Sequence, residues 1–523
     1  MGYKVSCSLL LSVWQYKWFL ALLAQTRSYL PIGLDACPVA VEVHSGRGLP
    51  GLAIVGLPDR AVTEAKERVR SALATSGFAL PSKRFTVNLA PADLRKEGGA
   101  FDLPIALGLL AASGHVDPLA LADVAAVGEL ALDGALRPVP GALSIALALR
   151  GQPVRLLVPA AHAAELGYVA GLNLLPAATL LEAVGVISGV QPAAPLPSPP
   201  SLPLDQYEVD LAEVRGQSYV KRALEVAATG GHHLLLVGPP GSGKSMLAQR
   251  LPTILPPLTL AEALEATAIH SLTGALNGRP ILRQRPFRAP HHTSSSIALV
   301  GGGSVPRPGE LSLAHHGVLF LDELPEFHRD ALEALRQPLE EGAVRIARAR
   351  RSLSFPARFM LVAAMNPCPC GHLTDPRRRC RCPSTKVASY LAKISGPLLD
   401  RIDLHIDVPA VPFDALTRAP EGESSASIRA RVHRAIAFRR TRGQQLSNSQ
   451  LRTKDLKTHC QMTSDVIALL KSAMQELNLS ARSYTKILKI ARTIADLAQQ
   501  DTLQPEHVAE AIQYRSLDRQ WWG

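Results

Sequence analysis

Residues 232–251, HHLLLVGPPGSGKSMLAQRL, decide the fold of this chain. The apolar run LLLV predicts a short buried strand, and SMLAQRL predicts a helix. Between them lies GPPGSGKS, which has the spacing of a phosphate-binding loop in the strand–loop–helix context that such a loop requires. Its glycines let backbone N–H groups turn towards a phosphate, and the helix directs its positive end at the anion. The eight loop residues are Gly238, Pro239, Pro240, Gly241, Ser242, Gly243, Lys244 and Ser245.

A second apolar strand, in GVLFLDE (317–323), ends in two carboxylates. We expect Lys244 to reach the β- and γ-phosphates of ATP, and Ser245 and Asp322 to hold Mg²⁺. Glu323 would polarise the attacking water. A carboxylate beside the metal-binding Asp favours hydrolysis over transfer to a bound hydroxyl. The pattern therefore predicts an ATPase built on a doubly wound parallel sheet.

Three further polar residues stand where ATP chemistry could use them. Asn366 ends the apolar strand in FMLVAAMNP (359–367) and would orient the water. Arg401, in GPLLDRIDLHIDV (396–408), is a candidate arginine finger for a neighbouring subunit's γ-phosphate, or else pairs locally with Asp400 or Asp403. Arg482 opens a helix and would close over the phosphates, or else is a surface residue.

The chain divides into segments of different composition. It has 523 residues, enough for about three domains. We expect an extension without function at 1–24, a mixed α/β domain at 25–190, a Pro-rich linker at 191–205, a P-loop domain at 206–412 and a helical segment at 413–523. In the first domain we predict strands at 37–44, 52–58 and 84–90, a helix at 62–77 and a hairpin within 125–139. In the last segment we predict helices at 464–477, 483–500 and 505–515.

Composition limits the partners and the compartment. Hydrophobic residues make up 47% of the chain, which excludes a disordered protein. The formal charge of +12 favours a polyanion partner, nucleic acid first. Seven cysteines are too few for a disulfide-stapled secreted protein. No membrane span is evident, so we expect a cytoplasmic protein without a membrane partner.

Four of the cysteines are clustered in PCPCGHLTDPRRRCRC. Cys368, Cys370, Cys380 and Cys382 could close a tetrahedral zinc site, although the C-x-C spacing is tighter than the usual C-x₂-C. Free cytosolic thiols are the alternative. Because ATP hydrolysis needs no zinc, any such ion would be structural.

Two segments could contact DNA. VRIARARRSLSFPARF (344–359) predicts a hairpin with Arg348, Arg350 and Arg351 at its tip. The loop LVGGGSVPRPG (299–309) carries Arg307 and ranks second. Arginines at such positions bind phosphates without reading sequence. A solvated charged hairpin is the alternative.

Several long motifs together resemble one family. They are FRAPHHTSSSIALVGGGSVPRPGELSLAHHGVLFLDELPEF (287–327), NLAPADLRKEGGAFDLPIALGLLAASG (88–114) and ARSYTKILKIARTIADLA (481–498). The sequence resembles the ComM/YifB family of magnesium-chelatase-like AAA+ ATPases from about residue 25 to 517. The resemblance implies an N-terminal domain with the Lon-protease-like fold, a central AAA+ domain and a C-terminal helical lid. It also implies a hexameric ring that drives branch migration of DNA as an ATP-dependent helicase in natural transformation.

The resemblance also implies roles for single residues. Lys244 and Ser245 match the Walker A pair, and Asp322 and Glu323 match the Walker B pair. The later motifs match in the same way, with Asn366 as first sensor, Arg401 as trans-acting finger and Arg482 as second sensor.

Two other functions share these ATPase motifs. Ala100 stands in KEGGAF (96–101) where Lon-type proteases carry their nucleophilic serine, so an ATP-dependent protease is disfavoured. A chelatase motor subunit that drives metal insertion into a tetrapyrrole is the stronger alternative. The fused Lon-like domain and the basic charge argue against it.

Overall fold

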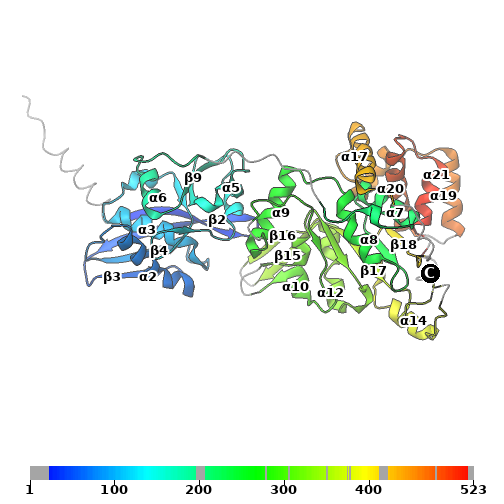
Figure 1. The fold of residues 1–523 in the computed structure, drawn as a ribbon, viewed down its shortest axis with the longest axis horizontal. Helices are drawn as coiled ribbons and strands as arrows, with labels where there is room; N and C mark the ends of the chain where they lie inside the picture. Colours follow the sequence, from blue (N-terminus) through cyan, green and yellow to red (C-terminus); the bar gives the residue numbers. More distant parts are fainter. Residues whose placement is uncertain are drawn as a thin grey trace, which may run out of the picture. The chain divides into compact units, whose positions relative to one another are not determined.

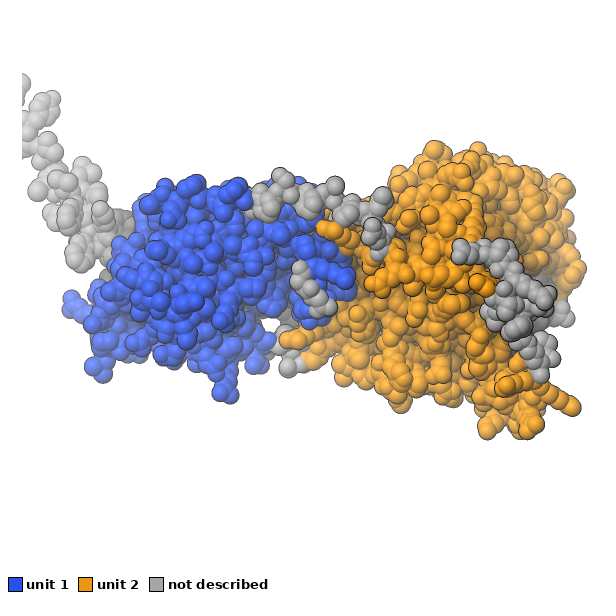
Figure 2. Space-filling view, viewed as in Figure 1, with its two compact units in different colours: residues 1–202, 267–282 blue, residues 203–266, 283–523 orange. Residues whose placement is uncertain are grey.

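The computed structural model of the chain consists of two compact units. Unit 1 contains residues 1–202 and 267–282, and unit 2 contains residues 203–266 and 283–523, coloured blue and orange in Figure 2. The structure describes residues 23–195, 207–276, 279–303, 307–348, 351–373, 375, 378–411, 422–476, 480–515 and 517, without the side chains of 347, 348, 351 and 352. Most of the expected extension and linker thus lie outside the described residues.

A mixed sheet of seven strands forms the centre of unit 1, in the order β3-β4-β2-β1-β5-β8-β9. The strands are β1 (Leu23–Ile32), β2 (Asp35–Gly46), β3 (Gly51–Val55), β4 (Arg84–Ala90), β5 (Val124–Ala126), β8 (Arg155–Pro159) and β9 (Asn173–Ala177). β1 pairs antiparallel with β2 and parallel with β5. Because β1 begins at Leu23, two residues that we assigned to the extension belong to the sheet.

Side-chain alternation explains how this sheet buries one face. Val39, Val41 and Val43 of β2 are buried and their neighbours are more exposed, the period-two pattern of a half-buried strand. Helix α2 (Arg60–Thr75) begins where the Asp59 side chain accepts a hydrogen bond from the backbone N–H of Val62. These elements confirm the predicted strands and helix of the first domain.

The predicted hairpin also lies in unit 1, as does Ala100, which stands where a Lon-type protease would carry its serine. β6 (Glu129–Leu130) and β7 (Leu136–Arg137) pair antiparallel around Gly134, which has the left-handed φ of 86°. Ala100 lies in a single 3-10 turn just before α3 (Asp102–Ala112). Every residue of α3 is buried, so this part of the unit is a packed core.

Unit 2 contains a five-stranded sheet in which every pairing is parallel, in the order β11-β14-β17-β10-β18. Its strands are β11 (Phe287–Arg288), β14 (Val318–Leu321), β17 (Met360–Met365), β10 (Leu234–Val237) and β18 (Leu404–Asp407), drawn in green and yellow in Figure 1. All residues of β10, β14 and β17 are buried. In parallel strands the carboxyl ends meet at one edge, which is where the motif residues stand.

Helices follow the sheet towards the C-terminus, orange to red in Figure 1. They include α17 (Ser425–Thr441), α19 (Ser464–Glu476), α20 (Ala481–Leu497) and α21 (Pro505–Gln513), the last three as predicted. Ile487 and Ile494 of α20 share one buried core with Leu234 and Leu404 of the sheet. Within the part of the chain that the structure describes, no helix is long and apolar enough to cross a bilayer.

Candidate active site

The phosphate-binding loop leaves β10 and enters α8 (Lys244–Arg250) through left-handed backbone. Gly241 and Gly243 have φ values of 75° and 86°, which residues with a Cβ seldom adopt. A Cβ on Gly238 would lie 2.2 Å from the carbonyl oxygen of Val408, so the loop can pass this close to β18 only with glycine there. The sequence GPPGSGKS therefore folds into a tight loop at the carboxyl edge of the sheet.

Lys244 reaches three acceptors around this loop. Its Nζ donates to the carbonyl oxygens of Gly238 at 2.8 Å and Pro239 at 2.9 Å, and to Oδ1 of Asn366 at 3.2 Å. Burial lowers the pKa of Lys244, and the negative charge of Asp322 partly offsets this effect. Asn366 directly follows β17, which lies between β10 and β14, so the sheet order places its amide beside the loop.

Ser245 and Asp322 form the candidate magnesium site. The Ser245 hydroxyl donates to Oδ2 of Asp322 at 2.7 Å, and Oδ1 of Asp322 accepts the backbone N–H of Glu323 at 2.9 Å. A hydroxyl and a carboxylate held this close are the oxygen donors that Mg²⁺ binds together with phosphate oxygens and water. The two residues therefore fit the ion that the family uses with ATP.

Glu323 has a neighbour that the sequence analysis did not single out. Nδ1 of His292 lies 3.2 Å from Oε2 of Glu323, and the rings of His291 and His292 are 4.1 Å apart. Glu323 itself has a left-handed φ of 52°, an uncommon conformation for a residue with a side chain, typical of functional sites. The adjacent histidines in APHHT (289–293) were the only signal in the sequence, and they did not indicate a partner.

A cavity of about 400 Å³ lies at the start of α7 (Ser218–Gly230). Gln217, just before this helix, donates from its amide to the carbonyl of Ser242 at 2.8 Å, which connects the cavity wall to the phosphate loop. The ring centroids of Tyr219 and Tyr514 are 5.6 Å apart, and burial raises the pKa of Tyr219 to about 12. The lining residues are Ser218, Tyr219, Arg222, Glu510, Gln513 and Tyr514. The Tyr219 ring is 40% exposed, so one aromatic face is open to a nucleobase.

The two candidate arginines do not join the phosphate loop. The Arg401 guanidinium donates to the Glu340 carboxylate and to the Pro397 carbonyl, so the expected alternative of pairing with Asp400 or Asp403 is wrong. These partners lie four and 61 residues away in sequence, and Pro397 belongs to α15 (Gly396–Leu399). In the described residues, no hydrogen bond or ion pair joins Arg401 to residues 238–245.

Arg482 instead lies close to the segment that carries Arg401. Its Nη1 donates to Oδ2 of Asp400 at 2.8 Å, and its side chain is 75% exposed. The structure thus brings the Arg482 side chain to Asp400, the residue before Arg401 in sequence. Neither guanidinium contacts the phosphate loop among the interactions of the described residues.

The candidate DNA contacts are described only in part. Arg307 is exposed on β13 (Arg307–Pro308), which pairs with β12 (Gly301–Gly302) directly after α10 (Ser296–Val300). β15 (Ala343–Arg348) and β16 (Arg351–Pro356) form the predicted hairpin, and Arg348 pairs with Arg351 at its end. Arg350 and the side chains of Arg348 and Arg351 lie outside the described residues.

The four clustered cysteines lie together. Their Sγ atoms are 3.4 Å apart for Cys368–Cys370, 3.7 Å for Cys368–Cys380 and 3.6 Å for Cys370–Cys380. The Sγ atom of Cys382 lies within 4.8 Å of the other three. The sequence thus brings its two C-x-C pairs to one point.

A second group with metal-binding side chains, Glu265, His315 and His316, has a different explanation. Nδ1 of His315 accepts the backbone N–H of Arg358 at 3.0 Å. A neutral imidazole that accepts at one nitrogen must donate at the other, so Nε2 of His315 donates to Glu265, 3.2 Å away. Because that nitrogen carries a proton, it has no lone pair for a metal, and the group is a hydrogen-bond network.

Comparisons with known proteins agree with this geometry. Residues 210–416 match the family described as magnesium chelatase, subunit ChlI, residues 41–162 match subunit ChlI of Mg-chelatase, and residues 422–515 match its C-terminal part. The phosphate loop, the paired carboxylates and the parallel sheet thus define an AAA+ ATPase of the magnesium-chelatase-like class.

Relatives along the whole chain identify the family. The chain is 46% identical to YifB of Escherichia coli over 489 residues, which covers 93% of this chain and 96% of YifB. It is 45% identical to the competence protein ComM of Haemophilus influenzae over 505 residues, 95% of this chain and 98% of ComM. The chain belongs to the ComM/YifB family of magnesium-chelatase-like ATPases. A more distant likeness, 25% over 205 residues, joins 36% of this chain to 20% of the DNA replication licensing factor Mcm2 of Drosophila melanogaster.

Proposed function

We propose that this ATPase is a ring motor that moves DNA, and that it serves as a branch-migration helicase in natural transformation. One observation carries the proposal: Lys244, Asn366, Ser245 and Asp322 are hydrogen-bonded as one ATP site in a chain that matches a competence protein over 95% of its length. We place the protein in the cytoplasm, where ATP and incoming DNA meet. We retain the division into a Lon-protease-like domain at 25–190, an AAA+ domain at 206–412 and a helical lid at 413–523.

Different residues of the site bind the phosphates, hold the metal ion and activate the attacking water. Backbone N–H groups of the loop and the Lys244 ammonium bind the phosphates, and the nucleobase lies against Tyr219. Ser245 and Asp322 would hold Mg²⁺, which supplies charge neutralisation at the phosphates. Glu323 accepts the proton of the attacking water, and Asn366 orients that water from the end of β17.

The two arginines complete the site of a neighbouring subunit. Arg482 bonds to Asp400 and Arg401 bonds to Glu340, and within the described part of the chain neither guanidinium bonds to the phosphate loop. A guanidinium can stabilise the charge of the transferring phosphoryl group only when it is aimed at it. The proposal therefore requires a closed homo-oligomer, and we expect a hexamer.

Contacts to DNA come from cationic loops. Arg307, Arg348, Arg350 and Arg351 would bind backbone phosphates, a mode that is independent of sequence and weakens with salt. A likeness of 26% over 224 residues to the DNA helicase MCM8 of Bos taurus supports a motor of this kind. The hairpin β15–β16 directly precedes β17, so a shift of Asn366 between nucleotide states can move it.

DNA-stimulated ATP hydrolysis by the full chain tests the proposal. Turnover is measured with single-stranded, duplex and branched DNA at low salt, and unwinding is followed on the branched substrate. We expect stimulation that Arg307→Ala combined with Arg348→Ala and Arg351→Ala reduces, whereas Arg60→Ala, an exposed arginine of unit 1, leaves it unchanged. ATP hydrolysis without any DNA binding at low salt would show that the motor acts on another substrate.

A chelatase motor is the second candidate, because all three family matches bear the name of magnesium chelatase. It predicts that deletion of the gene lowers tetrapyrrole levels and leaves the integration of incoming DNA, counted as transformants, intact. Our proposal predicts the opposite pair of results. Measurement of both in one deletion strain separates the two functions.

A further inference from the structure

The cluster of Cys368, Cys370, Cys380 and Cys382 has the dimensions of a tetrathiolate metal site. Three Sγ–Sγ distances, between 3.4 and 3.7 Å, are of one size. In a tetrahedral site with Zn–S bonds of about 2.3 Å, the sulfurs lie about 3.8 Å apart. A disulfide would need an S–S bond of about 2.05 Å, far shorter than these separations. The spacing therefore leaves room for one ion at the centre and excludes a bonded pair.

The surroundings of the cluster can stabilise the net negative charge that four thiolates around one divalent ion would carry. The backbone N–H of Cys382 donates to Sγ of Cys380 at 3.4 Å, a bond that stabilises a thiolate. Arg378, Arg379 and Arg381 stand in the same short segment and supply positive charge. Four soft sulfur ligands select zinc over magnesium or calcium, which take oxygen ligands.

We propose that these four cysteines bind one structural Zn²⁺, and that residues 368–373 and 378–382, called the zinc loop below, form a wall of the ATP site. The placement beside an ATP site rests on the proposed function. Cys368 follows Asn366 by two residues, so the ion anchors the chain just beyond the sensor. The ion also joins residues 368–370 to residues 380–382, immediately before α14 (Ser384–Leu391).

Gly371 shows how closely the zinc loop approaches the phosphate loop. It has a φ of 81°, and a Cβ at this position would lie 2.5 Å from Cδ of Pro240 and 3.8 Å from Cγ of Asn366. Only a glycine allows the two loops to approach this closely. A loop held by zinc therefore packs behind both the phosphate loop and the sensor amide.

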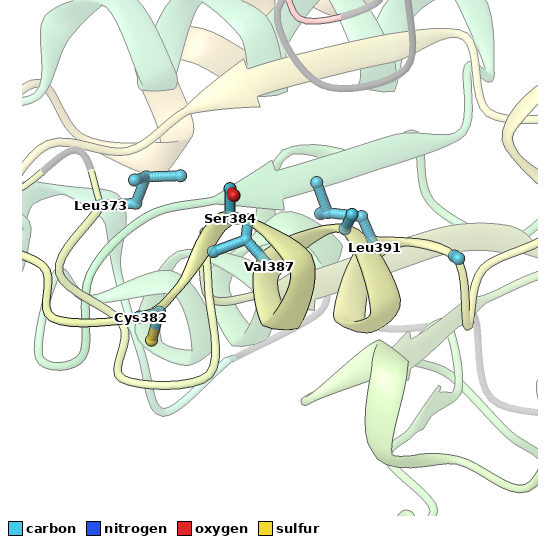
Figure 3. A pocket seen from close by; sticks show the side chains of 7 residues that line it. Leu373, Cys382, Ser384, Val387 and Leu391 are labelled. Atoms are coloured by element: carbon cyan, nitrogen blue, oxygen red, sulfur yellow. The ribbon is translucent and has the colours of Figure 1, made fainter.

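The outer side of the zinc loop faces a shallow cavity of about 570 Å³. Figure 3 shows Cys382 at the start of α14 and Leu373 on the facing loop, with Val387 and Leu391 along the helix. An ion bound by the four thiolates would join the described residues on the two sides of this segment.

Metal content of the full chain tests the site itself. The protein is purified without a metal-affinity tag, dialysed against a weak chelator and analysed by plasma mass spectrometry. We expect about one zinc per chain. We also expect that Co²⁺ added to the metal-stripped protein gives the intense absorption of a tetrahedral tetrathiolate site. Cys380→Ser with Cys382→Ser should lose both signals, whereas Cys37→Ser, outside the cluster, should keep them. Absence of zinc from a folded wild-type chain with four titratable thiols in the cluster would overturn the site.

Gly371→Ala tests the coupling to the ATP site separately. We expect this variant to retain zinc and a native circular dichroism spectrum but to hydrolyse ATP at least about tenfold more slowly, because small displacements of catalytic groups are costly. Wild-type turnover in Gly371→Ala would refute the coupling and leave the metal site standing. A wild-type chain that binds zinc but hydrolyses no ATP would refute the proposed function instead.

Discussion

Mixed rings test whether Arg401 acts on a neighbouring subunit. Arg401→Ala removes the proposed finger but leaves the remaining residues of its own candidate site, since in the described residues Arg401 bonds to Glu340 and Pro397 and not to the loop. Glu323→Gln removes the proposed catalytic carboxylate but still presents Arg401. An arginine finger contributes about 10³-fold or more to phosphoryl transfer, so each variant alone should be close to inactive.

The two variants should complement each other when they share a ring. In a random one-to-one mixture, a site works when it belongs to an Arg401→Ala subunit and faces a Glu323→Gln subunit. If the finger acts in trans, about one quarter of all sites meet this condition. The rings are obtained by co-expression with two different tags and purified on both. We therefore expect about a quarter of the wild-type turnover per subunit, measured by phosphate release.

The control is a ring that mixes Arg401→Ala with the double variant Arg401→Ala, Glu323→Gln. No subunit in this ring offers a finger, so turnover should stay at the level of the single variant. A first mixture no more active than this control would refute the trans assignment. Substantial turnover by Arg401→Ala alone would refute any role of Arg401 in hydrolysis.

Three further substitutions follow from single contacts. His292→Ala removes the imidazole 3.2 Å from Glu323. Because a small displacement of a reacting group is costly, kcat should fall about tenfold or more with KM for ATP unchanged, and an unaltered kcat would contradict the contact's role. Tyr219→Ala should raise KM for ATP about 5-fold or more, because base–aromatic stacking contributes about 1–3 kcal/mol, while Tyr219→Phe keeps the ring and the KM. His232→Ala breaks a buried pair of hydrogen bonds and should lower the free energy of unfolding by about 2–5 kcal/mol in calorimetry; the exposed His433→Ala serves as control, and equal melting temperatures would show that the buried contacts carry no stability.

The sequence predicted those parts of the site that local pattern determines. The phosphate loop lies between an apolar run and a helix, and Asp322 follows a second apolar run, so their elements could be recognised without contacts. The position of Asn366 beside Lys244 also followed, because parallel strands end at one edge. The local motifs were thus sufficient to predict where these strands end and which residues follow them.

Contacts between distant segments could not be predicted in this way. His292 reaches Glu323 across 31 residues, and Arg401 bonds to Glu340, 61 residues before it in sequence. Leu23 joins β1 through pairing with β2, a long-range contact that composition does not reveal. Each of these contacts joins residues that are distant in sequence and become neighbours only in the folded chain.

One face of α20 determines how the helical segment is joined to Arg401. Arg482 donates to Asp400, and Lys486, one turn further along α20, donates to the Ile402 carbonyl at 2.9 Å. Asp400 and Ile402 are the two neighbours of Arg401 in sequence. Burial would raise the pKa of Asp403, but the hydrogen bond from His232 and the charge of Lys486 outweigh it and hold the pKa below its usual range.

Asp403 consequently stays charged at neutral pH, and the ion pair with Lys486 persists. Two turns further along, Thr493 lies 2.8 Å from Nε2 of His232, whose other nitrogen contacts Asp403. The helix thus holds both the segment that follows α15 and His232, two residues before β10. A rotation of α20 should therefore displace Arg401 as well, since the largely buried Lys486 is hydrogen-bonded to the backbone of the residue next to it. In a ring, movement of the helical segment in one subunit would thereby change the position of the arginine offered to the next.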